Sequence, residues 1–452
     1  MAEIGHGHDF QLPGWGTKPS HATIRGRFLN TSCREMIKMA KSLYIAAMEP
    51  KSGKSVVALG LMEVLSRRVR KVGFFRPVIA SSDRRDKELH LILTRYNLAH
   101  TYEDAYAHTH DEARRMGAEG RYDELMKSVV GKYRELECRC DFVLCEGTDF
   151  TRASSAFEFE FNAHLANNLG APVLAMVNGL HSSADQVTQA VRVARESFRG
   201  QGCTLLATIV NRVDPQQADT VKQRFRGEGV KEGPVYILPD EETLGKPTMG
   251  EIAAALGGRI LQGDPGWLNR EVHGFKIAAM QLPNFLHHVL DGSLIITPGD
   301  RADVILVSLA TVFSETYPNI SGLLLTGGLR PEPQVQRLME GLSKSQVPVV
   351  SVETDTYTTA MNVSAVPAVL TPENDRKIAT ALGVFESHVD TTELGDLIAG
   401  APSTWVTPIM FENDLIERAR RNRQHIVPPE GRDERILKAC EILTRRKVVD
   451  IT

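Results

Sequence analysis

The residues best suited to chemistry in this chain stand at 48–55, in the run M-E-P-K-S-G-K-S. The run follows the phosphate-binding pattern G-x-x-x-x-G-K-[ST] except at its first position, where Met48 replaces glycine. In such a loop, backbone N–H groups and the N-terminus of the next helix stabilise an anionic phosphate. Lys54 would contact the outer phosphates, and the Ser55 hydroxyl would face Mg²⁺. The alternative is an ordinary strand-to-helix turn, with Lys54 solvated and Gly53 merely permitting the turn.

Two polar residues at later strand ends extend this candidate site. Glu146 follows an apolar run at 142–145, where a carboxylate can ligate Mg²⁺ directly or through water. Asn211 ends a later apolar run, where an amide can pair with the edge of a purine. Each residue alone is more typical of a cap or a turn. Together with the loop they predict a nucleotide site with Mg; the nucleotide-binding residues would be Lys51, Ser52, Gly53, Lys54, Ser55 and Asn211, and the metal-binding residues Ser55 and Glu146.

The elements that must position these residues alternate between strands and helices. Apolar strands are expected at 42–47, 72–76, 142–145, 172–177 and 205–210, and helices at 54–68 and 183–198. Apolar strands separated by helices are typical of a parallel sheet covered on both faces. The sequence therefore predicts an α/β fold that places the candidate loop after the first strand.

Composition bounds the class of protein. With 452 residues, 42% of them hydrophobic, two or three domains with ordinary cores are expected. The formal net charge of −3 argues against nucleic acid or an anionic membrane as the partner, and leaves small-molecule metabolites. Six irregularly spaced cysteines favour a cytoplasmic location. No apolar run approaches the roughly 20 residues that a membrane helix needs.

The segment 408–452 is expected to form one strand–loop–helix–strand unit behind a charged helix. Helices are expected at 411–423 and 435–446, and strands at 425–427 and 448–451. One such unit cannot bury the hydrophobic face that it creates. Either it docks on the rest of the chain or the chain is a fragment, and in the second case the last strand would fray or pair adventitiously.

Four motifs of the first region resemble the dethiobiotin-synthetase-like P-loop domain: M-E-P-K-S-G-K-S, F-F-R-P-V (74–78), C-E-G (145–147) and V-N-R-V-D (210–214). The resemblance implies carboxylation of a diamine with ATP and Mg, assisted by a lysine in a K-P-V motif. Arg76 stands at that position, and a guanidinium neither deprotonates nor replaces a lysine in such a site. An independent enzyme of this type, using Lys54, Ser55 and Glu146, is an alternative function, and Arg76 argues against it.

The next region is similar to a small domain known for its D-R-T-G-G motif. Its marks are T-P-G-D-R-A-D-V-I-L (297–306) and G-L-L-L-T-G-G-L-R-P (322–331), although Asp300-Arg301 is followed by Ala-Asp. Gly327-Gly328 should permit a tight turn after a strand at 323–325. The segment 354–356 can line a ligand crevice, but ordinary loop chemistry is the favoured interpretation because no nucleophile or acid–base pair stands out.

The run I-V-P-P-E-G-R-D-E-R-I-L-K-A (426–439) resembles the opening of the phosphate acetyl/butyryl transferase domain. In this order, the three modules are similar to the long form of bacterial phosphate acetyltransferase. The implied organisation is an extension or tag at 1–38, the P-loop parallel-sheet domain at 39–240, a smaller α/β DRTGG-like domain at 241–385, a linker at 386–407 and an incomplete α/β C-terminal piece, the start of the transferase domain, at 408–452.

That family transfers an acetyl group between coenzyme A and phosphate, and its N-terminal modules support assembly and response to metabolites. The resemblance implies a homo-oligomer for the full-length family. It also places the catalytic groups downstream of the opening strand and helix, so acetyl-CoA would bind only through the missing catalytic domain. The expected function is the nucleotide-binding, regulatory part of a phosphate acetyltransferase, with no catalytic residue and no transferase activity in this chain. A nucleotide-free scaffold is the second alternative.

Overall fold

The computed structural model describes residues 41–49, 52–81, 85–98, 100–148, 155–226, 233–342, 347–401 and 406–452. The expected extension at 1–38 and the candidate residue Lys51 lie outside these ranges. Among the described residues, no helix has both the length and the apolar character that crossing a membrane requires.

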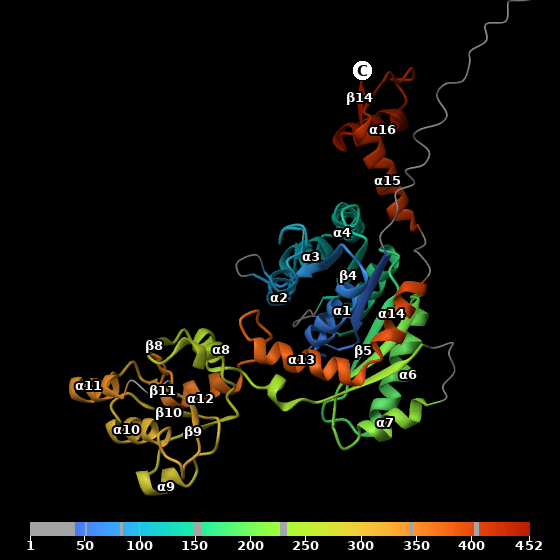
Figure 1. The fold of residues 1–452 in the computed structure, drawn as a ribbon. Helices are drawn as coiled ribbons and strands as arrows, with labels where there is room; N and C mark the ends of the chain where they lie inside the picture. The colour runs from blue at the N-terminus through green and yellow to red at the C-terminus, as the bar shows by residue number, and fades with distance from the viewer. Residues whose placement is uncertain are drawn as a thin grey trace, which may run out of the picture. The chain divides into compact units, whose positions relative to one another are not determined.

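A seven-stranded sheet forms the P-loop domain, in the order β3-β2-β4-β1-β5-β6-β7 (Figure 1). Every neighbouring pair is parallel, which confirms the predicted fold class. The strands are β1 Lys41–Ala47, β2 Val72–Ile79, β3 Tyr106–Thr109, β4 Phe142–Glu146, β5 Val173–Asn178, β6 Leu205–Val213 and β7 Val235–Pro239. The sequence predicted five of these; β3 and β7 were missed.

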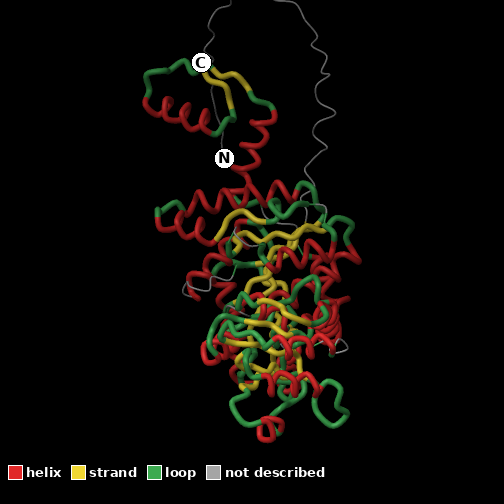
Figure 2. Tube along the Cα trace, turned by 90° about the vertical axis from the view of Figure 1, so that its left-hand side faces the viewer, coloured by secondary structure: helices red, strands yellow, loops and turns green. Residues whose placement is uncertain are grey.

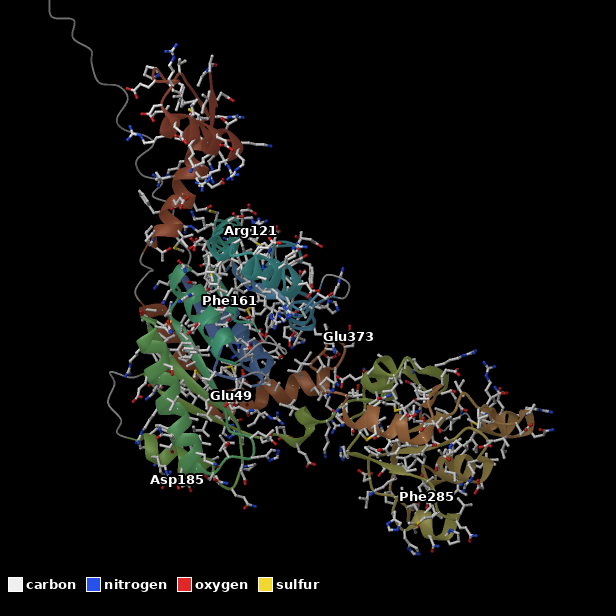
Figure 3. All side chains as sticks on the ribbon, turned by 180° about the vertical axis from the view of Figure 1, so that it is seen from behind. Glu49, Arg121, Phe161, Asp185, Phe285 and Glu373 are labelled. Carbon is white, nitrogen blue, oxygen red and sulfur yellow. The ribbon has the colours of Figure 1, made fainter. Side chains whose placement is uncertain are left out.

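Seven helices among the described residues accompany this sheet: α1 Lys54–Arg68, α2 Lys87–Tyr96, α3 His110–Ala118, α4 Tyr122–Glu137, α5 Ser155–Asn168, α6 Ala184–Gly200 and α7 Ala218–Phe225. Side chains of a strand point alternately to the two faces of the sheet. Leu43 and Ile45 of β1 accordingly join a core with α1, whereas Tyr44 and Ala46 join a second core with α4 and α5. Phe161 of α5 lies in that second core (Figure 3). The candidate loop is therefore held by a strand buried on both faces.

A second, five-stranded sheet has the order β8-β12-β11-β10-β9. Its elements are η2 Glu242–Gly245, α8 Met249–Ala255, β8 Arg259–Gln262, η3 Pro265–Asn269, β9 Gly274–Ile277, α9 Leu282–Leu286, β10 Ser293–Pro298, α10 Ala302–Thr311, β11 Ile320–Thr326, α11 Pro333–Gly341, β12 Val349–Ser351 and α12 Thr356–Ser364. Only β8 runs antiparallel. Gly327 and Gly328 have φ of 80° and 65°, which confirms the tight turn expected there.

Two helices after this sheet return to the P-loop domain: α13 Asp375–His388 and α14 Thr391–Gly400 (Figure 1). Phe385 of α13 is fully buried in the core that contains α1. A Cβ atom at Gly60 of α1 would lie 2.2 Å from the Phe385 ring. The stretch 386–407, expected as a linker, thus contains the end of α13 and all of α14.

The C-terminal piece consists of α15 Pro408–Arg421, β13 Gln424–Ile426, α16 Glu434–Arg445 and β14 Val449–Ile451. Met410 of α15 is buried against the P-loop domain, and Arg134 of α4 contacts Asp414 at 2.7 Å. The strands β13 and β14 pair in parallel beside the C-terminus (Figure 2). Helix α16 buries none of its residues, whereas Val449 of β14 is buried.

Candidate functional site

The candidate loop connects the end of β1 to the first residue of α1. Gly53 is the N-cap of α1 and has φ 77° and ψ 37°, a left-handed conformation that favours glycine. A Cβ atom there would also lie 2.2 Å from Nδ2 of Asn211. Gly53 is therefore needed both for the backbone turn and for the close approach of Asn211.

The amide of Asn211 holds this loop from the end of β6. Its Nδ2 donates to the Ser52 carbonyl at 2.9 Å, and its Oδ1 accepts from the Arg212 N–H at 3.0 Å. Both ends of the amide thus have backbone partners. In the structure Asn211 positions the loop, whereas its place at a strand end had suggested a purine edge as its partner.

Lys54 is buried, which disagrees with the alternative in which its side chain is solvated. Its Nζ donates to the Gly147 carbonyl at 2.6 Å, just beyond the end of β4. Because β4 lies next to β1, this contact draws the ammonium group to the carboxyl edge of the sheet. The chain crosses from one side of β1 to the other between β4 and β5, and such a switch point is where open α/β sheets bind ligands.

Glu146, the last residue of β4, brings a buried carboxyl group to the same edge. Only 1% of the residue is exposed, and burial raises its pKa to about 7, although the charges of Arg76 and Lys54 act in the opposite direction. Its Oε2 atom has no hydrogen-bond partner among the described residues, and neither do the buried hydroxyls of Ser52 and Thr148. Unpartnered buried oxygens are rare in folded proteins and call for a ligand, ion or water.

Arg76 of β2 is surrounded by carboxylates. Its Nη1 lies 2.5 Å from Asp86 and 3.0 Å from Glu88, and its Nε lies 3.6 Å from Glu146. Burial acts to lower the pKa of Arg76, but these three charges raise it well above its ordinary value. The guanidinium is therefore committed to its neighbours.

The sequence pattern did not single out Asp86 and Glu88. Asp86 is the N-cap of α2 and accepts from the Leu89 N–H at 3.1 Å, and Glu88 lies in the first turn. Acidic residues at a helix start usually act as caps, so their types alone indicate nothing further. The useful signal was an arginine inside a buried strand, which requires carboxylate partners nearby.

A cavity of about 510 Å³ opens beside the loop. It is lined by Gly53, Lys54, Ser55, Val56, Lys87, Glu88, Glu146, Asn211, Arg212, Pro239, Asp240, Glu241, Leu244, Gly245, Val366, Pro367, Ala368, Val369, Leu370 and Val384. Its size falls in the range of roughly 300–1,000 Å³ typical of ligand sites. The structure thus gathers Gly53, Lys54, Ser55, Glu146 and Asn211 around one space, whereas Ser52 of the same loop is buried and does not line it.

Among the described residues, no group of three or more His, Cys, Asp or Glu side chains is arranged to hold a metal ion. A magnesium ion that arrives with a nucleotide needs only one or two protein oxygens, because phosphates and water supply the rest. Ser55 and Glu146 both line the cavity, and Glu146 has an unpartnered oxygen. These two residues therefore fit such an ion.

Two family models match the chain, an AAA domain at residues 41–248 and a DRTGG domain at residues 251–366. Among solved structures, the chain is similar to the MinD cell division protein of Aquifex aeolicus, with 16% identity, 45% of this chain and 84% of that chain covered, and a TM-score of 0.28. It is also similar to the CBS and DRTGG domains of Clostridium perfringens pyrophosphatase, with 14% identity, 48% and 86% covered, and a TM-score of 0.23. Scores this low carry no argument.

Sequence relatives are more informative. The phosphate acetyltransferase of Nitratidesulfovibrio vulgaris is 46% identical over 425 residues, which are 91% of this chain and 59% of the relative. That of Synechocystis sp. is 31% identical over 92% of this chain and 60% of the relative. The chain thus spans about three fifths of the length of these relatives. Its AAA and DRTGG domains follow in the same order as the sequence motifs, and over 91% of its length the chain is similar to a phosphate acetyltransferase.

Proposed function

We propose that this chain is the nucleotide-binding, regulatory part of a phosphate acetyltransferase and that Mg-ATP is the ligand of its P-loop domain. The observation that carries the proposal is the cavity that the P-loop, Glu146 and Asn211 share. Lys54 and the N-terminus of α1 favour phosphate there, by charge and by the helix dipole. Ser55 and Glu146 would hold Mg²⁺, which neutralises the phosphates when bound.

The network around Arg76 favours binding over the dethiobiotin synthetase reaction. Arg76 occupies the place of that family's lysine, and its guanidinium contacts Asp86, Glu88 and Glu146. A guanidinium stays protonated, and this one is already paired, so it can neither lose a proton nor turn toward a substrate. The chain therefore binds the nucleotide as an effector.

Mg-ATP is expected to raise the melting temperature of the 452-residue chain, and Lys54→Ala is expected to abolish most of that increase. A ligand at about 100 times its Kd stabilises the folded state by roughly 2.7 kcal/mol. Lys54 lines the cavity, and its loss removes the cation that the P-loop pattern assigns to the outer phosphates. Thermal shift with and without millimolar Mg-ATP measures the effect.

Lys222→Ala is the matched control, because Lys222 is an exposed lysine on α7 that does not line the cavity. It should keep the full thermal shift. A wild-type chain that shows no shift at millimolar Mg-ATP would favour the nucleotide-free scaffold instead.

We further propose that this chain alone does not transfer acetyl groups. Acetyl transfer needs an enclosed phosphate clamp, a base for the thiol and donors for the developing oxyanion. Around the loop that precedes α16, Glu430 and Arg432 are exposed. Arg435 pairs with Asp433 of its own helix cap and has 90% of its side chain exposed. Of these charges, Asp433 caps α16, and Glu430 and Arg432 stand in the open loop before it.

We therefore expect no coenzyme A release above background when the chain is given acetyl-CoA and phosphate. Thiol release and acetyl phosphate formation are both measurable, with the phosphate acetyltransferase of Nitratidesulfovibrio vulgaris as the positive control. Sustained turnover by the 452-residue chain would refute this part of the proposal.

A further inference from the structure

The cavity beside the P-loop has a wall that comes from beyond the DRTGG domain. Residues 366–370 (V-P-A-V-L), here called the strap, connect α12 to α13 and line the cavity. Val366 packs on the core of the DRTGG domain. Leu370 is buried in the core that α1 shares with the P-loop sheet. Five residues thus bridge two hydrophobic cores and also face the ligand space.

The strap is anchored by a charged cluster at the start of the DRTGG domain. The Val369 N–H donates to Oε1 of Glu251 at 3.3 Å, and Nζ of Lys377 lies 3.4 Å from Oε2 of the same carboxylate. The Lys377 side chain is fully buried, and Glu251 also accepts from the Thr248 N–H at 2.9 Å. One carboxylate therefore ties together α8, the strap and α13.

The chemistry of the strap differs from that of the loop that it faces. All five of its residues are apolar, whereas Gly53, Lys54 and Ser55 present polar groups at a helix N-terminus. An apolar wall offers nothing to a phosphate, but it can pack against the face of a base or against a ribose. The cavity of about 510 Å³ is also larger than bare phosphates need. A nucleotide matches both surfaces at once.

We propose that the strap is part of the nucleotide site, with the base or ribose of a P-loop-bound nucleotide packed against residues 366–370. This inference rests on the proposed nucleotide binding by the P-loop. Binding then fixes the strap, and through Glu251 and Lys377 it links the P-loop domain to the DRTGG domain. The site is therefore composite, built from segments on both sides of the DRTGG domain.

The test compares two ligands on the full 452-residue chain by calorimetry: Mg-ATP, and Mg-tripolyphosphate, which has phosphates but no base or sugar. Ala368→Trp fills the space beside the strap. We expect it to weaken Mg-ATP by about tenfold or more while changing Mg-tripolyphosphate by no more than about twofold. Ala365→Trp is the matched control, because Ala365 is exposed at the end of α12 and does not line the cavity.

Lys54→Ala separates this inference from the proposed function, because it should weaken both ligands. If Lys54→Ala loses Mg-ATP but Ala368→Trp binds it as the wild type does, the P-loop site stands and the strap proposal is overturned. If the wild type binds neither ligand, both proposals fall.

Hydrogen exchange on the wild type provides a second measurement that needs no variant. Mg-ATP should slow exchange in 366–377 and in 248–252, and Mg-tripolyphosphate should slow it only around the P-loop. Protection by Mg-ATP confined to the P-loop would overturn the link to the DRTGG domain.

Discussion

Arg76→Met is expected to lower the free energy of unfolding by about 3–5 kcal/mol at pH 7, because it leaves buried carboxylates without their cation. The Arg76 side chain is only 8% exposed and contacts three acidic side chains, of which Asp86 and Glu146 are buried. Methionine keeps the unbranched apolar stem of the side chain, so the loss reflects mainly the missing charge. Urea unfolding at pH 7 measures the effect.

Arg139→Met, which changes an exposed ion pair in the same way, provides the control. Arg139 contacts Asp104 at 3.1 Å with 48% of its side chain exposed, and such pairs contribute about 1 kcal/mol or less. Arg76→Lys adds a second comparison, since it keeps the charge but loses the planar fork that reaches several carboxylates, and should give an intermediate loss. Equal losses for Arg76→Met and Arg139→Met would contradict the network described here.

Local signals were enough to predict the framework of the P-loop domain. Helix α1 begins and ends where expected, at Lys54 and Arg68, with a glycine directly before its first residue. Strand β3 escaped detection because it has four residues at an edge of the sheet, and three of them are only half-buried. Short, half-exposed strands carry little apolar pattern.

The sequence located the loop and the strand ends of the site but not their partners. Gly53 and Lys54 are recognisable from adjacent residues, and Glu146 from the apolar run before it. Asn211 was identified, yet its contact with the Ser52 carbonyl depends on how β6 and the loop meet in space. The strap lies still farther along the chain, after a whole domain, and no local pattern connects it to the loop.

The return of α13 to the P-loop domain was equally hidden. Phe385 is an ordinary apolar residue of a helix, and Gly60 is a glycine inside another helix, where it costs about 1 kcal/mol relative to alanine. Their relation appears only in the structure, where the missing Cβ of Gly60 makes room for the Phe385 ring. Shape complementarity between distant residues leaves no periodic signal in one sequence.

The titration of Glu146 should make the stability of the chain depend on pH. Its pKa is raised from 4.5 to about 7, so between these values the folded state binds more protons than the unfolded state. Stability from this group is therefore present at low pH and is lost as the pH rises toward 7, by up to about 3 kcal/mol. We expect Glu146→Gln to remove this dependence.

The quantity to measure is the difference in unfolding free energy between Glu146→Gln and wild type, at pH 5 and at pH 8. The difference should shift in favour of Glu146→Gln by roughly 2.5 kcal/mol between these pH values, because glutamine is never charged. Glu135→Gln on the exposed side of α4 controls for the substitution itself. A constant difference would mean that Glu146 does not titrate in this range.

Mg-ATP should reverse the advantage of Glu146→Gln at pH 8. A bound cation favours the ionised form of Glu146. Burial penalises this carboxylate when it lacks the cation, but it strengthens the attraction between the two charges when Mg²⁺ is bound. Wild type should therefore gain more stability from Mg-ATP than Glu146→Gln does, and the gain should grow with pH from about 5 to 8. Equal gains at every pH would place Mg²⁺ away from Glu146 while leaving nucleotide binding at Lys54 intact.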